Sequence, residues 1–252
     1  METLAFVSVA LVALASTAVG VRLLLVARRT RGFPELVLGL SLAAITGVGF
    51  PIVLLTELRQ TIGPSLTLAA DFVGSFVVAM GFAGFYVFTW RVFRPRSRWA
   101  AALTTLGAGA ALVATAATVW LAVGVKSNEE KFDVVRDWEI VLFTTAAVGF
   151  LWSAVEAFAY HVSLRRRLAL GLADAIVTNR VLLWGLTGAS AGTALVIVTL
   201  LRLMDVNYMS APVALFTTAG CGFLVSVFLY LAFLPPAAYL RWFERASVPA
   251  GS

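Results

Sequence analysis

Seven long apolar runs, separated by short polar segments, dominate this chain of 252 residues. A helix needs about 20 mainly apolar residues to cross the hydrocarbon core of a bilayer, and each run reaches that length. The runs lie at 4–27, 36–56, 68–90, 99–125, 138–162, 181–201 and 212–234. We therefore predict an all-α polytopic membrane protein, a bundle of seven transmembrane helices.

The composition favours the same class. Hydrophobic residues make up 61% of the chain and charged residues 13%, whereas soluble domains are about one quarter charged. The runs leave little chain for a soluble domain, so we expect one seven-helix membrane domain over residues 1–252, without a kinase, cyclase or ATPase module. The segment 237–252 has an amphipathic pattern and is expected to lie at the membrane interface.

Basic residues are distributed unequally between the two sides of the predicted bundle. Of the 19 Lys and Arg residues, one, Arg22, lies inside the first run, five lie on the N-terminal side, and thirteen lie on the opposite side. The thirteen are Arg28, Arg29, Arg31, Arg91, Arg94, Arg96, Arg98, Arg165, Arg166, Arg167, Arg180, Arg241 and Arg245. Because positive residues favour the cytoplasmic side, we predict an external N-terminus and a cytoplasmic C-terminus, in a plasma membrane of the bacterial inner-membrane type.

The same asymmetry explains the net charge of +6 without nucleic acid, which we do not expect as a partner. Anionic lipid headgroups attract arginines that lie close to the membrane surface. We therefore expect membrane lipid to be the partner of the arginine-rich face.

Several polar side chains lie close to hydrocarbon depth around the fifth and sixth runs. The predicted intramembrane polar cluster consists of Glu156, Arg91, Arg180, His161 and Asn179. Glu156 precedes Arg165 by nine residues, which places it about 13 Å from the basic loop at the rise of an α-helix. A carboxylate at that depth is costly unless it is paired or protonated. We expect Arg91 or Arg180 to be its partner.

Three interpretations of Glu156 are open from the sequence. The carboxylate can be a fixed polar tie that sets helix register, a switchable ion pair between helices, or the proton site of a carrier. His161 is the only histidine, and at the inner interface we expect it to act as an anchor. The spacing of five residues places His161 about 140° around the helix from Glu156, so the two side chains do not stack.

The sequence Gly188-Ala189-Ser190-Ala191-Gly192 matches the G-x-S-x-G string of serine hydrolases. That motif works on a strained turn between a strand and a helix, whereas here it falls in the middle of an apolar run. Small residues four apart on a membrane helix are typical of close helix packing. We therefore predict that Gly188 and Gly192 form a packing face.

The chain offers few ligands for a metal or a cofactor. One histidine and one cysteine, Cys221, cannot form a multi-histidine metal site, a haem site with two histidine ligands or a two-cysteine motif. In topology alone, seven spans with an external N-terminus resemble microbial rhodopsins and heptahelical receptors. A covalent retinal pigment would need a lysine in the last span, and Lys126 and Lys131 both fall in the fourth loop. We expect no metal and no cofactor.

A further group of charged residues lies at the opposite ends of the second, third, sixth and seventh runs. The outer-rim ligand candidates are Glu57, Arg59, Asp71, Arg202 and Asp205. If the bundle closes in sequence order, these residues can ring an outward cavity. Ordinary solvated helix ends are the simpler explanation.

These patterns contain no catalytic cluster, so we do not expect an enzyme. Our first hypothesis is a sensor or receptor-like module, or a subunit of a larger membrane complex, with a protein partner or a second copy of the chain at the basic face. The alternative is a small-solute or ion transporter that uses Glu156 as its coupling site.

Overall fold

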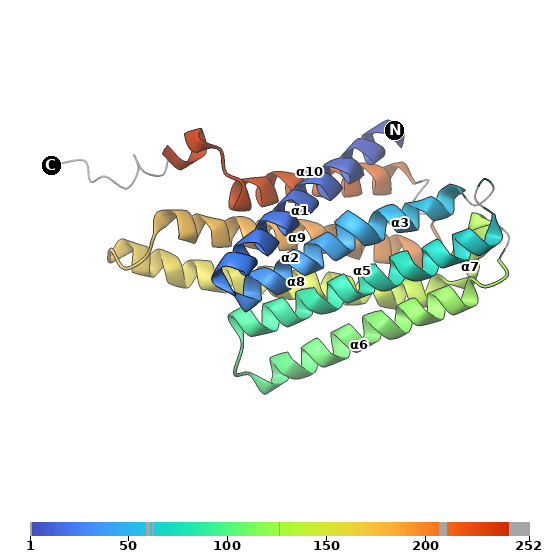
Figure 1. Cartoon of the computed structure of the whole chain (residues 1–252), viewed down its shortest axis with the longest axis horizontal. Helices are drawn as coiled ribbons and strands as arrows, with labels where there is room; N and C mark the ends of the chain where they lie inside the picture. The colour runs from blue at the N-terminus through green and yellow to red at the C-terminus, as the bar shows by residue number, and fades with distance from the viewer. Residues whose placement is uncertain (1, 59–60, 62, 126, 207–210, 242–252) are drawn as a thin grey trace.

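The structure is a computed structural model that describes residues 2–58, 61, 63–125, 127–206 and 211–241 (Figure 1). Within these residues the regular structure is entirely helical, and seven helical stretches are long and apolar enough to cross a membrane. The predicted all-α class with seven membrane-length helices is therefore confirmed. The seven stretches are Ala10–Thr30, Phe33–Leu54, Pro64–Phe93, Arg98–Leu121, Arg136–Ala169, Ala175–Leu203 and Pro212–Phe233.

Six of the spans are continuous helices and one is composite. The continuous helices are α1 (Glu2–Thr30), α5 (Pro64–Phe93), α6 (Arg98–Leu121), α8 (Arg136–Ala169), α9 (Ala175–Leu203) and α10 (Pro212–Phe233). The second span consists of α2 (Phe33–Leu42), a π-helical segment η1 (Ala43–Gly49) and α3 (Phe50–Leu54), followed by a 3₁₀ turn η2 (Leu55–Leu58). A short helix, α7 (Asn128–Val134), lies before α8.

Helix α8 is longer than its apolar run. Its 34 residues span about 51 Å at the rise of an α-helix, against a hydrocarbon core of about 30 Å. Arg166 and Arg167 lie in its last turn, so the predicted basic loop is largely helical. Only residues 170–174 connect α8 to α9.

The spans pack in sequence order, and the ring they form is closed. Each span contacts the next one along the chain, and α1 contacts α10. Helices α5 and α8 also contact each other across the ring. Figure 1 shows the resulting elongated bundle, with α7 at one end of α5 and the α8–α9 connection at the other.

The interruption of the second span follows from a proline. Pro51 lacks an N–H and cannot bond to the carbonyl of Gly47, one turn earlier. The preceding residues form a π-helix instead, in which the N–H of Phe50 reaches the carbonyl of Ile45. Gly49 lies close against α5 at this point. An added Cβ there would be 2.6 Å from Val78 Cγ2, so the contact leaves no room for a side chain.

Aromatic side chains fill the centre of the bundle. The rings of Phe85 and Phe150 lie 4.6 Å apart, and those of Phe85 and Trp184 lie 5.7 Å apart. Large apolar side chains on the outside, such as Leu106 and Trp120, are more than two thirds exposed. An apolar outer surface of this kind suits contact with lipid.

Tyr86 connects three helices near this core. Its side chain, on α5, occupies a slot between Gly107 on α6 and Gly149 on α8, where an added Cβ would lie 2.5 Å and 2.9 Å from the ring. The Tyr86 hydroxyl donates to the carbonyl of Thr145 at 2.7 Å. Glycine is needed at both positions because the ring takes the space of a side chain.

The predicted interfacial tail, 237–252, is described only in part. Residues 237–241 are helical, and residues 242–252 lie outside the described residues. Asn179 Nδ2 on α9 donates to the hydroxyl of Tyr239 at 2.7 Å. This bond attaches the start of the tail to the bundle.

Candidate functional site

Ion pairs that include buried charges gather at two opposite ends of the bundle. The first group, which we call the arginine-rich end, is built on Glu156 and Arg94. The second, which we call the α7 end, comprises Asp71, Lys131, Phe132, Arg136, Glu139, Arg202 and Asp205. Helix α5 separates the two ends, because Asp71 lies near its start and Arg94 follows its last residue.

At the arginine-rich end, Glu156 is held by two side chains. Arg94 Nε lies 2.9 Å from both carboxylate oxygens, and Trp152 Nε1 donates to Oε1 at 3.3 Å. The Glu156 side chain is 8% exposed and that of Arg94 is 48% exposed. A deeply buried carboxylate is therefore neutralised by an arginine that still reaches solvent or headgroups.

Glu156 pairs with an arginine, as predicted, but the partner is Arg94. The prediction of Arg91 or Arg180 was wrong. Arg91 lies in the last turn of α5, with its guanidinium 4.8 Å from the ring of Trp90 and 5.9 Å from that of Phe33. Arg180 is exposed on α9. Arg94 follows the end of α5, and its backbone, with φ −136° and ψ 47°, has left the helix. The direction of the Arg94 side chain is therefore not set by the helix, and it reaches Glu156. Arg91, still within the helix, points toward Phe33 and Trp90 instead.

Aromatic rings surround the pair. The ring of Trp152 lies 6.1 Å from Tyr86 and 5.8 Å from Trp99, so the indole that binds Glu156 is itself held by two further helices. The hydrogen bond to Glu156 raises the pKa of Arg94, with the attraction between their charges as a second cause. Arg94 therefore stays charged.

The remaining members of the predicted intramembrane cluster make other contacts. His161 Nδ1 lies 2.9 Å from the carbonyl of Thr178 and connects α8 to α9, and Asn179 bonds to Tyr239. The sequence placed these residues with Glu156 on depth alone. In the structure they tie α8, α9 and the C-terminal segment together.

The two glycines of the G-x-S-x-G string lie against α8. An added Cβ at Gly188 would lie 2.9 Å from the carbonyl oxygen of Phe150, and one at Gly192 would lie 2.7 Å from Leu151 Cδ2. The string lies inside the continuous helix α9, whereas a nucleophile elbow needs a strand-to-helix turn. The spacing therefore serves the contact between α8 and α9.

At the α7 end, an ion pair joins α7 to α5. Lys131 Nζ lies 2.7 Å from Asp71 Oδ2, and Asp71 is only 4% exposed. Ser75 Oγ makes a longer contact, 3.4 Å, to Oδ1 of the same carboxylate. Helix α7 begins with Ser127 as its N-cap, whose hydroxyl accepts from the N–H of Glu130 at 3.1 Å. This cap fixes the start of the helix that carries Lys131.

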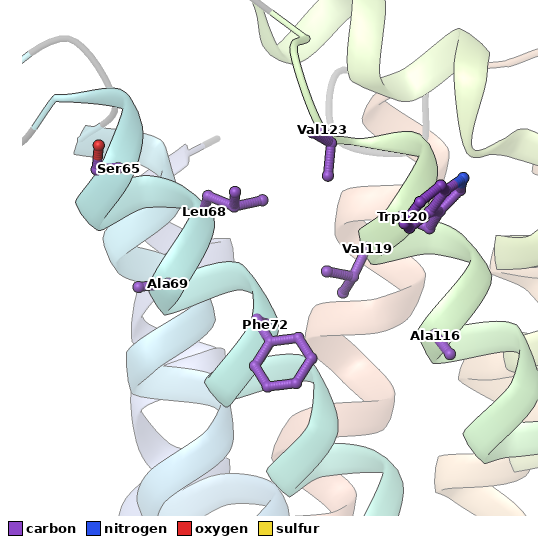
Figure 2. A pocket seen from close by; sticks show the side chains of 8 residues that line it. All are labelled: Ser65, Leu68, Ala69, Phe72, Ala116, Val119, Trp120 and Val123. Atoms are coloured by element: carbon purple, nitrogen blue, oxygen red, sulfur yellow. The ribbon is translucent and has the colours of Figure 1, made fainter.

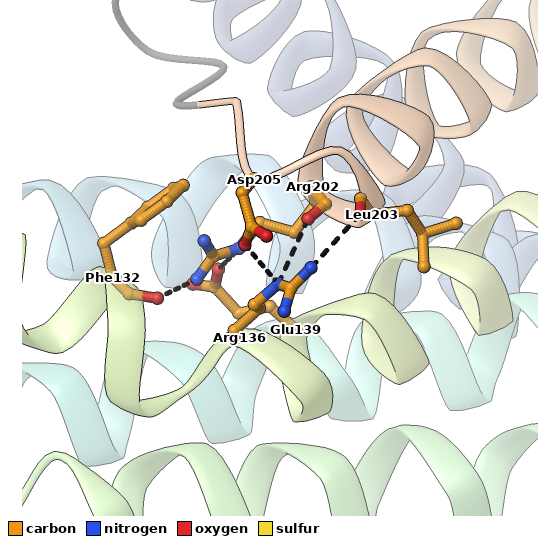
Figure 3. Close-up of polar contacts among 6 residues, drawn as sticks. All are labelled: Phe132, Arg136, Glu139, Arg202, Leu203 and Asp205. Carbon is orange, nitrogen blue, oxygen red and sulfur yellow. Dashed lines mark hydrogen bonds and ion pairs between the residues drawn. The ribbon is translucent and has the colours of Figure 1, made fainter.

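Arg202 is fully buried at the same end (Figure 3). Its Nε donates to Glu139 at 2.9 Å, its Nη2 donates to the carbonyl of Phe132, and the guanidinium carbon lies 3.3 Å from the centroid of the Phe132 ring. The third nitrogen, Nη1, is buried without a hydrogen-bond partner. A buried donor of this kind is costly to leave unpaired.

A second arginine closes the network. Arg136 Nε lies 2.7 Å from Asp205, and its Nη2 donates to the carbonyl of Leu203 at 3.1 Å (Figure 3). Asp205 has φ 56°, the left-handed conformation that commonly follows the last turn of a helix and that Asp tolerates better than most residues. The end of α9 is thus fixed to the start of α8.

The structure brings three of the five outer-rim candidates into this network. Asp71, Arg202 and Asp205 each have a partner of opposite charge. Arg59 lies outside the described residues, and so does the side chain of Glu57. Lys131, Phe132, Arg136 and Glu139 were not predicted as site residues. For Glu139 the available signal was an acid at the start of the fifth run, at a depth matching the bases at the end of the sixth run, whereas the other three residues lie in the fourth loop and carry no such signal.

An apolar groove lies between α5 and α6, on the outside of the bundle. It has a volume of about 460 Å³, and Figure 2 shows its wall. The lining residues are Ser65, Leu68, Ala69, Phe72, Ala116, Val119, Trp120 and Val123. Apart from the Ser65 hydroxyl and the Trp120 indole N–H, this wall is hydrocarbon, which suits an apolar chain rather than a polar substrate.

Among the described residues, no group of three or more His, Cys, Asp or Glu side chains is placed to hold a metal ion. Comparison with protein-family models, with curated proteins and with solved structures gives no match.

Proposed function

We propose that the chain is a seven-helix membrane module that senses a condition on one side of a bacterial plasma membrane and passes the signal to a protein partner on the other. We include in this proposal a module that works as a subunit of a larger membrane complex. We assign it no catalytic step.

One observation carries the proposal: α8, and α5 with the residue that follows it, each contribute charges to the ion pairs at both ends. Helix α5 carries Asp71 and leads into Arg94, and α8 carries Glu139 and Glu156. The two helices contact each other between these points. Continuous helices packed around aromatic rings move as rigid bodies, so a change in the ion pairs at one end has a mechanical route to the other.

The distribution of arginines sets the proposed direction of signalling. By the positive-inside tendency, the arginine-rich end faces the cytoplasm and the α7 end faces outward. A partner or a second copy of the chain would then dock at the arginine-rich face, where the last turn of α8 presents Arg166 and Arg167. Anionic headgroups attract the same arginines.

The alternative function is transport with Glu156 as the coupling site. The burial of Glu156 favours it, because a buried carboxylate is what a proton-coupled carrier needs. The bond from Arg94 to both carboxylate oxygens opposes it, because both oxygens are already occupied by a cationic partner within the protein. We therefore place sensing ahead of transport.

Purification of the tagged full chain in native lipid discs tests the proposal. We expect a second chain, or a second copy, to co-purify in fixed stoichiometry and to be lost when Arg166 and Arg167 are replaced by Gln. The matched control is Arg22→Gln, which changes a basic residue outside the arginine-rich face. A monomeric protein that drives uptake of a solute into vesicles, with the uptake lost in Glu156→Gln, would favour the transporter instead.

A further inference from the structure

Helix α7 contacts the buried charges at its end of the bundle through two consecutive residues, one of which donates a hydrogen bond while the other accepts one. Lys131 places an ammonium group on the buried carboxylate of Asp71. Phe132, the next residue, places its carbonyl oxygen on Nη2 of the buried Arg202. The main body of the bundle thus presents a carboxylate, Asp71, and a guanidinium, Arg202. Helix α7 pairs the carboxylate with an ammonium group and the guanidinium with a carbonyl oxygen.

The Phe132 carbonyl satisfies Arg202 incompletely. It supplies one acceptor to Nη2, and Nη1 beside it is buried without a hydrogen-bond partner. A carboxylate presents two oxygens in a plane and matches the two terminal nitrogens of a guanidinium. A ligand carboxylate in place of the Phe132 carbonyl would therefore satisfy a donor that α7 leaves unused.

The other charges at this end are already balanced. Glu139 accepts from Arg202 Nε and leaves the Nη edge to α7, and Asp205 is neutralised by Arg136. Displacing α7 would leave the Asp71 carboxylate without Lys131 and would open the Nη edge of Arg202. A simple anion would meet the uncompensated Asp71, whereas a molecule with its own ammonium group would neutralise it.

We propose that Asp71 and Arg202 form a binding site for a small amino-carboxylate, an amino acid or a chemically similar zwitterion, and that α7 closes this site with its own Lys131 and Phe132. The ligand ammonium binds Asp71 and the ligand carboxylate binds the Nη edge of Arg202. Helix α7 acts as an internal competitor, so the ligand binds as α7 lifts. Gly124, with φ 86°, precedes α7 at a position where the chain can turn.

This site would give the proposed sensor its ligand, so its role in signalling rests on the proposed function. Binding itself does not, because it needs no partner. Displacement of α7 would break the Lys131–Asp71 pair at one end of α5, the helix that leads to Arg94 at the other. Ligand binding would thereby change the contacts of a helix that spans the membrane.

Equilibrium binding to the full-length protein in lipid discs tests the site. The probes are the twenty proteinogenic amino acids, γ-aminobutyrate and ε-aminocaproate, with n-butylamine and n-butyrate as single-charge controls. We expect at least one amino-carboxylate to bind, and n-butylamine and n-butyrate to bind at least about tenfold more weakly, since each makes one of the two charged contacts. Equal binding of either single-charge probe would overturn the two-point site.

Two variants should change the affinity in opposite directions. Asp71→Asn removes the ammonium site and should weaken binding by about tenfold or more. Lys131→Met removes the internal competitor and should tighten binding, because the protein no longer spends part of its time closed. Lys126→Met, a change of the other lysine in the same loop, is the matched control and should leave the affinity unchanged. A purely structural ion pair predicts no ligand binding in any of them.

The outcomes also separate this inference from the proposed function. Failure of every amino-carboxylate to bind both the wild type and a folded Lys131→Met variant would refute the site, while a co-purifying partner would still support the sensor. Binding accompanied by uptake of the same labelled ligand into vesicles would support the site and refute the sensor.

Discussion

Arg94 Nε lies 2.9 Å from each carboxylate oxygen of Glu156, yet the two side chains differ about sixfold in exposure, 48% against 8%. The two residues therefore contribute unequally to the pair. Removing the exposed arginine strands a buried charge, whereas removing the buried charge leaves an arginine that can turn toward water or headgroups.

The first prediction follows from this inequality. We expect Arg94→Ala to lower the free energy of unfolding by up to about 3 kcal/mol, below the cost of breaking a fully buried pair because Arg94 is half exposed, and Glu156→Gln to lower it by less. Thermal or denaturant unfolding in detergent measures both. Arg96→Ala, which changes an exposed neighbouring arginine, is the control. A larger loss in Glu156→Gln than in Arg94→Ala would contradict the unequal contribution of the two residues.

A second prediction concerns the glycines between α8 and α9. Gly188→Ala should cost about 1–3 kcal/mol, because the added Cβ would lie 2.9 Å from a backbone carbonyl and the helices must separate. Gly192→Ala should cost less, because its nearest obstacles, Leu151 Cδ2 and Cγ at 2.7 Å, belong to a side chain that can change rotamer, whereas the obstacle at Gly188 is backbone. Melting temperatures of the purified variants give the order.

Two substitutions serve as controls for the glycine series. Gly109→Ala on α6, where an added Cβ meets nothing within 4 Å, should be neutral or stabilising by up to about 1 kcal/mol through helix propensity. Ser190→Ala keeps a small side chain and should leave stability unchanged. If Gly109→Ala were as damaging as Gly188→Ala, close packing would not explain the effect.

The third prediction uses the slot that holds Tyr86. Gly107→Ala places a Cβ 2.5 Å from the Tyr86 ring and should strongly destabilise the bundle. Tyr86→Leu should also destabilise it, through the lost bond to Thr145 and the space left behind. The loss of stability in the double variant, Gly107→Ala with Tyr86→Leu, should be smaller than the sum of the two single losses by about 0.5–3 kcal/mol, because the alanine then occupies space that the tyrosine ring has left. Strict additivity in a double-mutant cycle would contradict the slot.

The fourth prediction addresses orientation. A reporter fused after Arg245 should be active on the cytoplasmic side, and a tag inserted at Glu130 should be accessible from outside. Thirteen of the 19 basic residues lie on the side assigned to the cytoplasm, which is the physical reason for this expectation. Labelling of intact cells and of inverted vesicles checks both positions, and the opposite pattern would reverse the proposed direction of signalling.

Hydropathy predicted the spans because the cost of exposing polar backbone and side chains to lipid is local to each run. The ends of the helices were predicted less well. Arg166 and Arg167 lie in the last turn of α8, beyond the apolar run, where hydropathy falls although the backbone remains helical.

Specific partners depended on tertiary geometry that a span-by-span interpretation lacks. Glu156 was expected to pair with an arginine, and it does. That this arginine is Arg94 depends on where α5 ends, at Phe93, one residue before Arg94. Lys131 and Phe132 became site residues only because α7 packs across the ends of α5 and α9. No periodicity in the fourth loop indicates where that short helix would lie.

The π-helical segment of the second span affects how the bundle tolerates a change in chain length. Within Ala43–Gly49 the backbone bonds reach five residues back rather than four, so this segment holds one residue more than an α-helix needs. Deleting a residue there would restore α-helical spacing and keep the faces on either side in phase. A deletion in α5 between Asp71 and Arg94 would instead rotate every side chain beyond it by about 100°. Asp71 and Arg94 could then no longer both face their partners. The second span is thus the place where the deletion of one residue can be absorbed.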